Sequence, residues 1–358
     1  MSRILSIMIL VVLTVSMLLI GCVPPEEVPV SPTPEEQPEV IEWRFHSQTT
    51  EKRPEFTAQK DWADMVYKAT DGRLKITVYP YGALGVTDDA ILRAVGQGLL
   101  ESSFSYGGYY TRDEPILSML VPNACGVFTS RKEYVEILPY ATELAREIYA
   151  KWNCHLFTWY GIPGCYVGLA ARQPINSLEG MKGLKLRVFP DPIQIEALSS
   201  LGVSAQTFPQ ADIYLNLKNK VVDGAVVLVG MESALSLPEV TPYYSTFTYY
   251  TAGVGHICNE DAFQALPKDI QDILTKVSEE HARKWNERAL DCSWDDETLV
   301  SLAKEQGLNL LPDFSDEDKQ ALSNAAVKAW RKIAEQYGPE AVKYQKLMEA
   351  ELNRIRES

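Results

Sequence analysis

Apolar and polar residues alternate in several short segments of the chain, which is typical of β-strands. In LKITVY (74–79) and LKLRVF (184–189) the alternation lets each segment bury one face of a pleated strand. SSFSY (102–106) and AQTF (205–208) are shorter candidates. GAVVLVG (224–230) is apolar throughout, which indicates a strand that is buried on both faces.

Between these strands, apolar residues recur with the spacing of a helix. Trp62, Met65, Val66 and Ala69 share one helical face, and Gly72 follows as a stop. The same reasoning predicts helices over 88–95, 192–201, 212–219 and within 315–357, the last of which starts at the N-capping sequence SDED. Strands that alternate with helices favour parallel pairing and an α/β fold.

A segment near the C-terminal third, 268–306, contains neither glycine nor proline. A single helix over this segment would be roughly 58 Å long at about 1.5 Å per residue, enough to lie across two domains and brace them. Two ordinary helices with a break near 292–294 fit the pattern equally well. Both interpretations stay open at the level of sequence.

The first residues have the pattern of an export signal. Arg3 precedes an apolar run over 4–20, which is followed by Gly21 and Cys22. The tetrapeptide LIGC resembles a lipobox, so Cys22 is expected to be the lipid-modified first residue of the mature chain. An uncleaved membrane anchor is the alternative. Both interpretations place the rest of the chain outside the cytoplasm, on the outer face of the cell membrane or in the periplasm.

The segment that follows Cys22 is rich in proline and glutamate up to about residue 41. Such a composition cannot bury a core, and proline keeps it extended, so we expect a tether between the lipidated cysteine and a folded body. The remaining residues of the 358-residue chain are numerous enough for two domains.

The net charge limits the possible partners of the protein, and the cysteine spacing limits its possible metal sites. The net charge of −14 argues against nucleic acid as a partner, because there is no basic stripe to neutralise phosphates. Five cysteines besides Cys22 form no metal-binding spacing and leave open whether one disulfide forms or all are buried thiols: Cys125, Cys154, Cys165, Cys258 and Cys292.

Motifs of common enzymes are missing from the sequence. There is no nucleophile elbow, P-loop or dinucleotide-binding glycine pattern. The four histidines are isolated from one another, and His256 lies in an apolar stretch that suggests a core position. The acidic pairs at 88–89 and 295–296 fit solvated helix faces better than acid–base catalysis. We therefore expect no catalytic residues, no metal and no cofactor.

Five sequence blocks resemble the solute-binding proteins of tripartite ATP-independent periplasmic (TRAP) transporters. In order, they are VYPYGALG, QGLLESSFS, INSLEGMKGLKLRV, LGVSAQTFPQADIYLNLKNKVVDG and a following helix led by Leu-Pro. The resemblance implies two α/β domains around a ligand cleft, with a long helix bracing both. It assigns 42–165 with about 250–290 to one domain and 166–249 with about 291–358 to the other.

The function implied by this resemblance is capture of a small organic acid and its delivery to a sodium-driven membrane permease. Three alternatives remain: the binding protein of another kind of importer, an exported enzyme on a similar frame, or an adhesion or structural module. Ligand-dependent closure without turnover would distinguish a binding protein from an enzyme. A specific small-molecule ligand would distinguish both from an adhesion module.

In this family the arginine of the GLKLRV strand pairs with the ligand carboxylate, and Arg187 matches that position. A planar guanidinium can form two parallel hydrogen bonds with a carboxylate. Aromatic or apolar residues stand where other members have polar or metal-binding groups: Tyr106, Tyr166, Val226 and Val227. The implied ligand-binding set is Arg187, Tyr106, Tyr166, Phe189, Gln210 and Val227, with Tyr109 as a further aromatic candidate and core packing as the alternative role for Tyr109 and Phe189.

Overall fold

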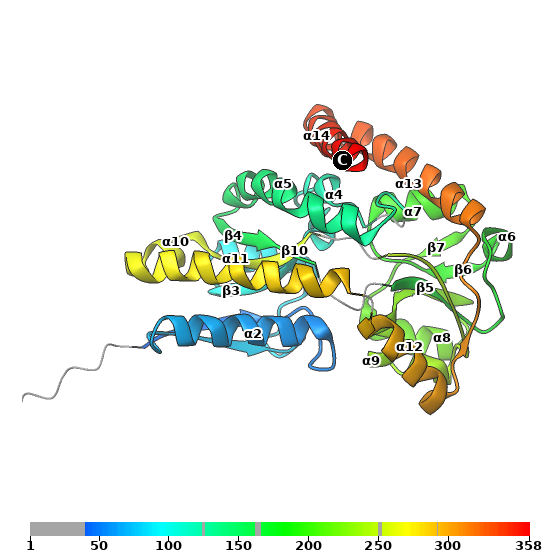
Figure 1. Ribbon diagram of the computed structural model, residues 1–358, viewed down its shortest axis with the longest axis horizontal. Helices are drawn as coiled ribbons and strands as arrows, with labels where there is room; N and C mark the ends of the chain where they lie inside the picture. The colour runs from blue at the N-terminus through cyan, green and yellow to red at the C-terminus, as the bar shows by residue number, and fades with distance from the viewer. Residues whose placement is uncertain (1–39, 124–125, 162–165, 250–252, 292) are drawn as a thin grey trace, which may run out of the picture. The chain divides into compact units, whose positions relative to one another are not determined.

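The computed structural model describes residues 40–123, 126–161, 166–249, 253–291 and 293–358. These residues form two β-sheets with helices packed around them, the α/β class that the sequence predicts (Figure 1). None of the helices described is both long enough and apolar enough to cross a membrane. The expected signal, the lipidated Cys22 and nearly all of the tether lie outside the described residues.

The first sheet has the strand order β2-β1-β3-β10-β4. Its strands are β1 (Ile41–His46), β2 (Leu74–Tyr79), β3 (Ser102–Tyr106), β4 (Cys154–Trp159) and β10 (Val254–Asn259). β1 pairs in parallel with β2 and β3, as alternating strands and helices predict, whereas β10 is antiparallel to both of its neighbours.

The second sheet has the strand order β11-β9-β5-β8-β6-β7. Its strands are β5 (Tyr166–Ala171), β6 (Lys185–Arg187), β7 (Ser204–Gln206), β8 (Gly224–Leu228), β9 (Tyr243–Tyr249) and β11 (Asn309–Leu310). β6 pairs in parallel with β7 and β8, and β5 is antiparallel to β8 and β9. The carboxyl ends of β6 and β8 therefore meet at one edge, where open α/β sheets bind ligands.

Helices and single helical turns connect these strands. Before β8 they are α2 (Pro54–Ala69), η1 (Asp88–Ala90), α3 (Ile91–Gly96), η2 (Gly107–Tyr110), α4 (Leu117–Leu120), α5 (Arg131–Ala150), α6 (Leu178–Met181), α7 (Pro192–Ser200), η3 (Gln210–Asp212) and α8 (Ile213–Lys218). After β8 they are α9 (Val229–Ala234), η4 (Leu237–Glu239), α10 (Glu260–Gln264), α11 (Lys268–Leu290), α12 (Ser293–Gln306), α13 (Asp316–Tyr337) and α14 (Pro339–Glu357).

The apolar face predicted for the first helix packs against the first sheet. Trp62 and Val66 of α2 are fully buried, and the ring of Trp62 lies 5.6 Å from that of Phe45 on β1. Burial of these large side chains supplies the hydrophobic free energy that holds α2 against the sheet.

The chain passes between the two sheets after β4 and again before β10. The glycine-free segment makes a further passage, but as two helices: α11 ends at Leu290 and α12 begins at Ser293. α11 packs against α2, β4 and α5, and α12 packs against α9 and β11. The expectation of one continuous bracing helix is therefore wrong, and the alternative break near 292–294 is confirmed.

The two C-terminal helices also contact both halves of the molecule. Ser315 caps α13 by accepting a hydrogen bond from the Asp318 backbone N–H, as the SDED sequence predicts. α13 packs against α7 beside the second sheet, and α14 packs against α4 and α5 beside the first (Figure 1). The C-terminal helices thus contact both parts of the chain that we assign to separate domains, and those domain boundaries remain a prediction.

Cys154 and Cys258 are buried free thiols, as one of the two sequence interpretations expects. The other cysteines lie outside the described residues: Cys125, Cys165 and Cys292.

Candidate functional site

A small cavity of about 40 Å³ is lined by residues from both sheets, and we call it the inter-sheet cavity. From the first sheet and its loops it is lined by Gln48, Thr49, Arg53, Glu55, Phe104, Tyr106, Tyr109 and Val254. From the second sheet and its loops it is lined by Phe189, Gln210, Leu228 and Met231. Four residues that the sequence singles out are therefore brought together here: Tyr106, Tyr109, Phe189 and Gln210.

Arg187 is the last residue of β6 and is 1% exposed. Its guanidinium carbon lies 4.9 Å from the centroid of the Phe189 ring, within the range of a cation–π contact. Phe189 itself forms part of the wall of the inter-sheet cavity. The end of β6 therefore places a buried guanidinium next to the cavity wall, and its role as a ligand contact stays a prediction.

The pKa of Tyr109 is affected by charged residues around the cavity. Burial raises the pKa of its hydroxyl and Asp88 adds to the shift, whereas Arg187 and Arg53 both oppose it.

Gly108, two residues after Tyr106 in the SYGGYY sequence, leaves room for the Tyr106 ring. A Cβ atom at Gly108 would lie 2.3 Å from the Tyr106 hydroxyl oxygen, so a larger residue would displace the phenol ring. The ring meets that of Tyr109 edge-on, with centroids 4.8 Å apart. Two aromatic rings therefore form one wall of the cavity.

A buried hydrogen-bond network connects Tyr106 to Phe189. The Asn123 side-chain amide donates to the Tyr106 hydroxyl over 2.8 Å. The Gln194 amide donates to the Asn123 backbone carbonyl over 3.2 Å, and its oxygen accepts from the Phe189 backbone N–H over 2.7 Å. The loop before α5 thus fixes aromatic residues from both sheets. No sequence motif marks Asn123 for this role.

Arg53 and Glu55 also line the inter-sheet cavity, and sequence reasoning missed both. They form an ion pair whose side chains are 5% and 4% exposed. The Arg53 Nε donates to Glu55 over 3.0 Å, and a second nitrogen donates to the other carboxylate oxygen. Arg53 is therefore a second buried cation at this cavity besides Arg187, and none of the family blocks in the sequence includes it. The surrounding sequence TTEKRPEF resembles an ordinary polar loop, so no pattern in the sequence marks Arg53 as a buried residue.

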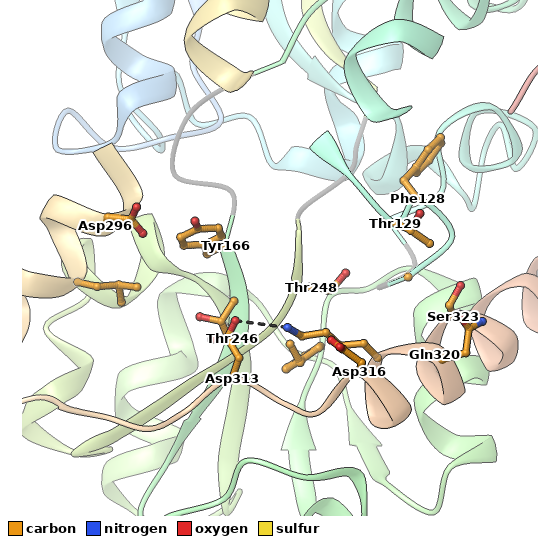
Figure 2. Close-up of a pocket in the computed structure, with 14 residues that line it drawn as sticks. Phe128, Thr129, Tyr166, Thr246, Thr248, Asp296, Asp313, Asp316, Gln320 and Ser323 are labelled. Atoms are coloured by element: carbon orange, nitrogen blue, oxygen red, sulfur yellow. Dashed lines mark hydrogen bonds and ion pairs between the residues drawn. The ribbon is translucent and has the colours of Figure 1, made fainter. Parts of the chain in front are cut away.

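Tyr166 and Val227 do not line the inter-sheet cavity. Val227 is fully buried within β8, and the cavity is lined instead by the next residue, Leu228. Tyr166 lies in a larger cavity of about 450 Å³, which we call the acidic cavity because Asp296, Asp313 and Asp316 line it (Figure 2). The smaller cavity is the candidate site, because aromatic residues of both sheets line it together with Arg53 and Glu55, and the Arg187 guanidinium lies against its Phe189 wall.

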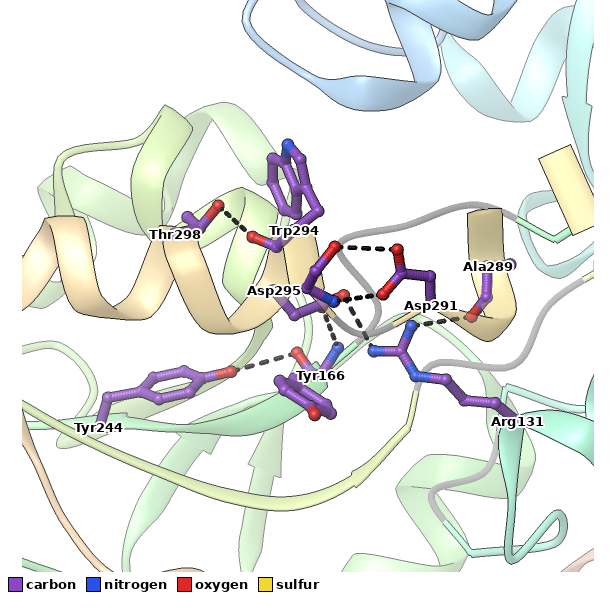
Figure 3. A network of polar contacts seen from close by, with 9 residues as sticks. Arg131, Tyr166, Tyr244, Ala289, Asp291, Trp294, Asp295 and Thr298 are labelled. Carbon is purple, nitrogen blue, oxygen red and sulfur yellow. Dashed lines mark hydrogen bonds and ion pairs between the residues drawn. The ribbon is translucent and has the colours of Figure 1, made fainter. Parts of the chain in front are cut away.

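A buried ion pair between Arg131 and Asp295 connects α5 to α12 (Figure 3). Arg131, the first residue of α5, donates to Asp295 of α12 over 2.9 Å and to the Ala289 carbonyl of α11 over 2.9 Å. Asp295 also accepts from the Tyr166 backbone N–H over 3.0 Å. Its side chain is fully buried, so the expectation of a solvated acidic face is wrong for Asp295.

His256 is a core residue, as its apolar neighbourhood predicts. It is 2% exposed, and its Nε2 lies 2.8 Å from the Tyr160 hydroxyl oxygen. Burial lowers the pKa of His256 well below its ordinary value, with nearby His281 adding to the shift. The imidazole is therefore neutral.

The model of the family "Bacterial extracellular solute-binding protein, family 7" matches residues 45–337. A monocarboxylate 2-oxoacid-binding periplasmic protein of Nostoc is 27% identical over 67% of this chain and 66% of its own length. The sialic acid-binding periplasmic protein of Vibrio cholerae is 24% identical over 72% of this chain and 78% of its own length.

Solved structures show the same fold. A TRAP periplasmic solute-binding protein of Desulfovibrio desulfuricans, with bound sn-glycerol-3-phosphate, superimposes with a TM-score of 0.77 at 19% identity, covering 89% of this chain and 98% of its own. A Bordetella pertussis receptor that binds pyroglutamic acid gives 0.75 at 17% identity, covering 86% and 99%. With the family match over most of its length, this chain belongs to family 7 of the bacterial extracellular solute-binding proteins, the solute-binding proteins of TRAP transporters.

Proposed function

We propose that this protein captures a small monocarboxylate in the inter-sheet cavity and delivers it to a sodium-driven TRAP permease. The observation that carries the proposal is Arg187, a buried guanidinium stacked on a cavity-lining ring at the carboxyl end of β6. A guanidinium in a water-poor site binds a carboxylate through two charge-assisted hydrogen bonds.

The aromatic wall supports a ligand body that is less hydrophilic than a sugar. Tyr106 and Phe189 are each 4% exposed, and Leu228 and Met231 are further apolar lining residues. Several relatives are named for organic acids, including 2-oxoacids and pyroglutamic acid. We propose that the ligand has one carboxylate on an apolar or aromatic body, and that it is released unchanged rather than converted.

Arg187→Ala tests this proposal. Loss of the partner of a buried carboxylate should weaken binding by about 2–5 kcal/mol. Arg187→Lys should recover only part of the affinity, because an ammonium cannot form the planar two-bond contact. A thermal-shift screen of aliphatic, aromatic, oxo-, di- and sugar acids identifies the ligand, and calorimetry then measures each variant.

Arg172→Ala is the matched control. Arg172 follows β5 of the same sheet, is partly buried and donates to the Val222 carbonyl, but it does not line the inter-sheet cavity. Unchanged affinity in Arg187→Ala would refute the proposed carboxylate contact. Hits confined to sugar acids or dicarboxylates would refute the apolar body.

We also propose that Cys22 is lipidated and anchors the protein at the outer face of the membrane. The LIGC sequence after an apolar run supports this. Cys22→Ala should release the protein from membranes prepared from cells fed labelled fatty acid. The absence of label in the wild-type chain would contradict the anchor.

A further inference from the structure

The Arg53–Glu55 ion pair occupies an unusual place. Both side chains are almost completely buried, and both line the inter-sheet cavity together with Tyr106 and Phe189. Arg53 directly precedes α2, and Glu55 lies in the first turn of that helix. The pair therefore brings one hydrogen-bond donor group and one acceptor group to the cavity wall.

Stability alone does not explain this pair. Burying two charges costs several kcal/mol of desolvation per ion, and apolar residues of similar size often stabilise a protein as well or better. The partners are two positions apart, so their bond joins no distant segments. An acidic residue in the first turn favours helix formation, but this needs neither burial nor an arginine partner.

Arg53 also lies against the second sheet's side of the cavity. A Cβ atom added to Gly230 of α9 would be 3.5 Å from the Arg53 Nε. Gly230 lies two residues after Leu228, the residue of β8 that lines the cavity. Arg53 therefore lies where elements of both sheets meet, which is where a ligand held between them would make contacts.

The charges near the cavity restrict the ligand's net charge. Arg53 and Glu55 carry opposite charges that balance each other in the cavity wall. A second carboxylate or an ammonium group on the ligand would bring an additional charge to this balanced pair, and burying such a charge is costly in a water-poor site. A neutral group adds no charge there.

We propose that Arg53 and Glu55 recognise a second, neutral group on the ligand that both accepts and donates a hydrogen bond. The inference rests on the proposed binding of a monocarboxylate through Arg187. The Arg53 guanidinium donates to an oxygen of this group, and the Glu55 carboxylate accepts its N–H or O–H. The ligand class is therefore a monocarboxylate whose far end carries an amide or a hydroxyl.

A panel of acids with matched bodies tests the ligand class. Butanoate, 4-hydroxybutanoate, succinamate, 4-aminobutanoate and succinate share one chain and differ only at the far end. The corresponding pentanoic and benzoic acids extend the panel to longer and aromatic bodies. On the best-bound body, calorimetry at pH 7 should show the amide or hydroxyl member binding at least about tenfold more tightly than the other three end groups.

Glu55→Gln tests the role of the pair without removing its size. The substitution removes the negative charge of Glu55 from the pair, so the preference should shift at least about tenfold from the ligand with an amide end to the ligand with a second carboxylate. Glu51→Gln and Lys52→Met, on the same loop and exposed, should leave the preference unchanged. Arg53→Lys should weaken the amide and hydroxyl members while sparing the apolar member.

The outcomes separate this inference from the proposed function. If all end groups bind alike and Arg187→Ala weakens all of them, the carboxylate site stands and the second recognition point is refuted. If Glu55→Gln lowers only the melting temperature and leaves the preference unchanged, the pair is structural and the inference is again refuted. If none of the acids in the panel binds, whatever its carbon chain or ring, both the proposed function and this inference fail.

Discussion

Removal of the Arg131 side chain should destabilise the protein more than any surface substitution. Its guanidinium bonds to Asp295 and to the Ala289 carbonyl, each over 2.9 Å, and the two charged side chains are 7% and 0% exposed. Arg131→Ala therefore leaves a fully buried carboxylate without its cation at the point where α5, α11, α12 and β5 meet.

The size of the effect follows from these contacts. Breaking a buried ion pair from one side costs about 3–5 kcal/mol, because the remaining charge is left uncompensated. The lost bond to the Ala289 carbonyl adds about 1 kcal/mol. We expect a loss of about 4–6 kcal/mol, a large part of the roughly 5–15 kcal/mol that stabilises a typical folded chain. Asp295→Asn keeps an acceptor for the Tyr166 N–H but removes the carboxylate that balances the buried Arg131 guanidinium, so it should also cost about 3–5 kcal/mol.

Urea unfolding followed by tryptophan fluorescence measures the free energy of unfolding of each variant. Lys132→Ala is the control. Lys132 is next to Arg131 in the chain, but its side chain is 67% exposed, so its removal should change the free energy of unfolding by about 0.5 kcal/mol or less. The reasoning would be refuted if Arg131→Ala and Lys132→Ala unfolded within about 1 kcal/mol of each other.

Two further predictions concern pH and cations. Burial lowers the pKa of His281 to about 4, against about 6.5 in an unfolded chain, so the unfolded state takes up a proton first as pH falls. Stability should decline by up to about 1.4 kcal/mol per pH unit between these values, and His281→Gln, which keeps a donor for the Ala58 carbonyl, should flatten the urea-midpoint profile there. The family resemblance implies that Val226 and Val227, both buried, stand where other members have metal-binding residues. Ligand affinity should therefore be the same after chelation and sodium removal, and a large loss of affinity in calorimetry would contradict this.

The regular elements of the fold were largely predictable from the sequence. The alternating segment 74–79 is β2, and its first residues alternate between buried and exposed as strand geometry requires. The shorter candidate 102–106 is β3, which is buried at every position. The apolar segment 224–230 shows the limit of this reasoning. Its last two residues begin α9, since a continuous apolar run has no periodicity that distinguishes a buried strand from a buried helix.

The break between α11 and α12 has a local cause that helix propensity does not reveal. Asp291 accepts hydrogen bonds from both the backbone N–H and the hydroxyl of Ser293, which satisfies groups at the start of α12. Ser293 followed by Asp296 is also a capping pattern, so the sequence held a signal for the break.

The site was only partly predictable. Arg187, Phe189 and Tyr106 were found through family motifs, and they lie at or beside one cavity. Arg53 and Glu55 belong to no motif, and their burial depends on contacts with α9, more than 170 positions away in the chain. Residue type alone cannot show that such a loop faces a cavity.

The small volume of the inter-sheet cavity has a kinetic consequence. A space of about 40 Å³ holds a few water molecules, far less than the roughly 300–1,000 Å³ of sites that enclose larger organic ligands. The walls must therefore separate before an organic acid enters, and a separation that precedes ligand binding limits the association rate. At high ligand concentration the observed association rate should level off at the opening rate. Chemically different acids would then share one maximum rate, and their affinities would differ almost entirely in how slowly each one leaves.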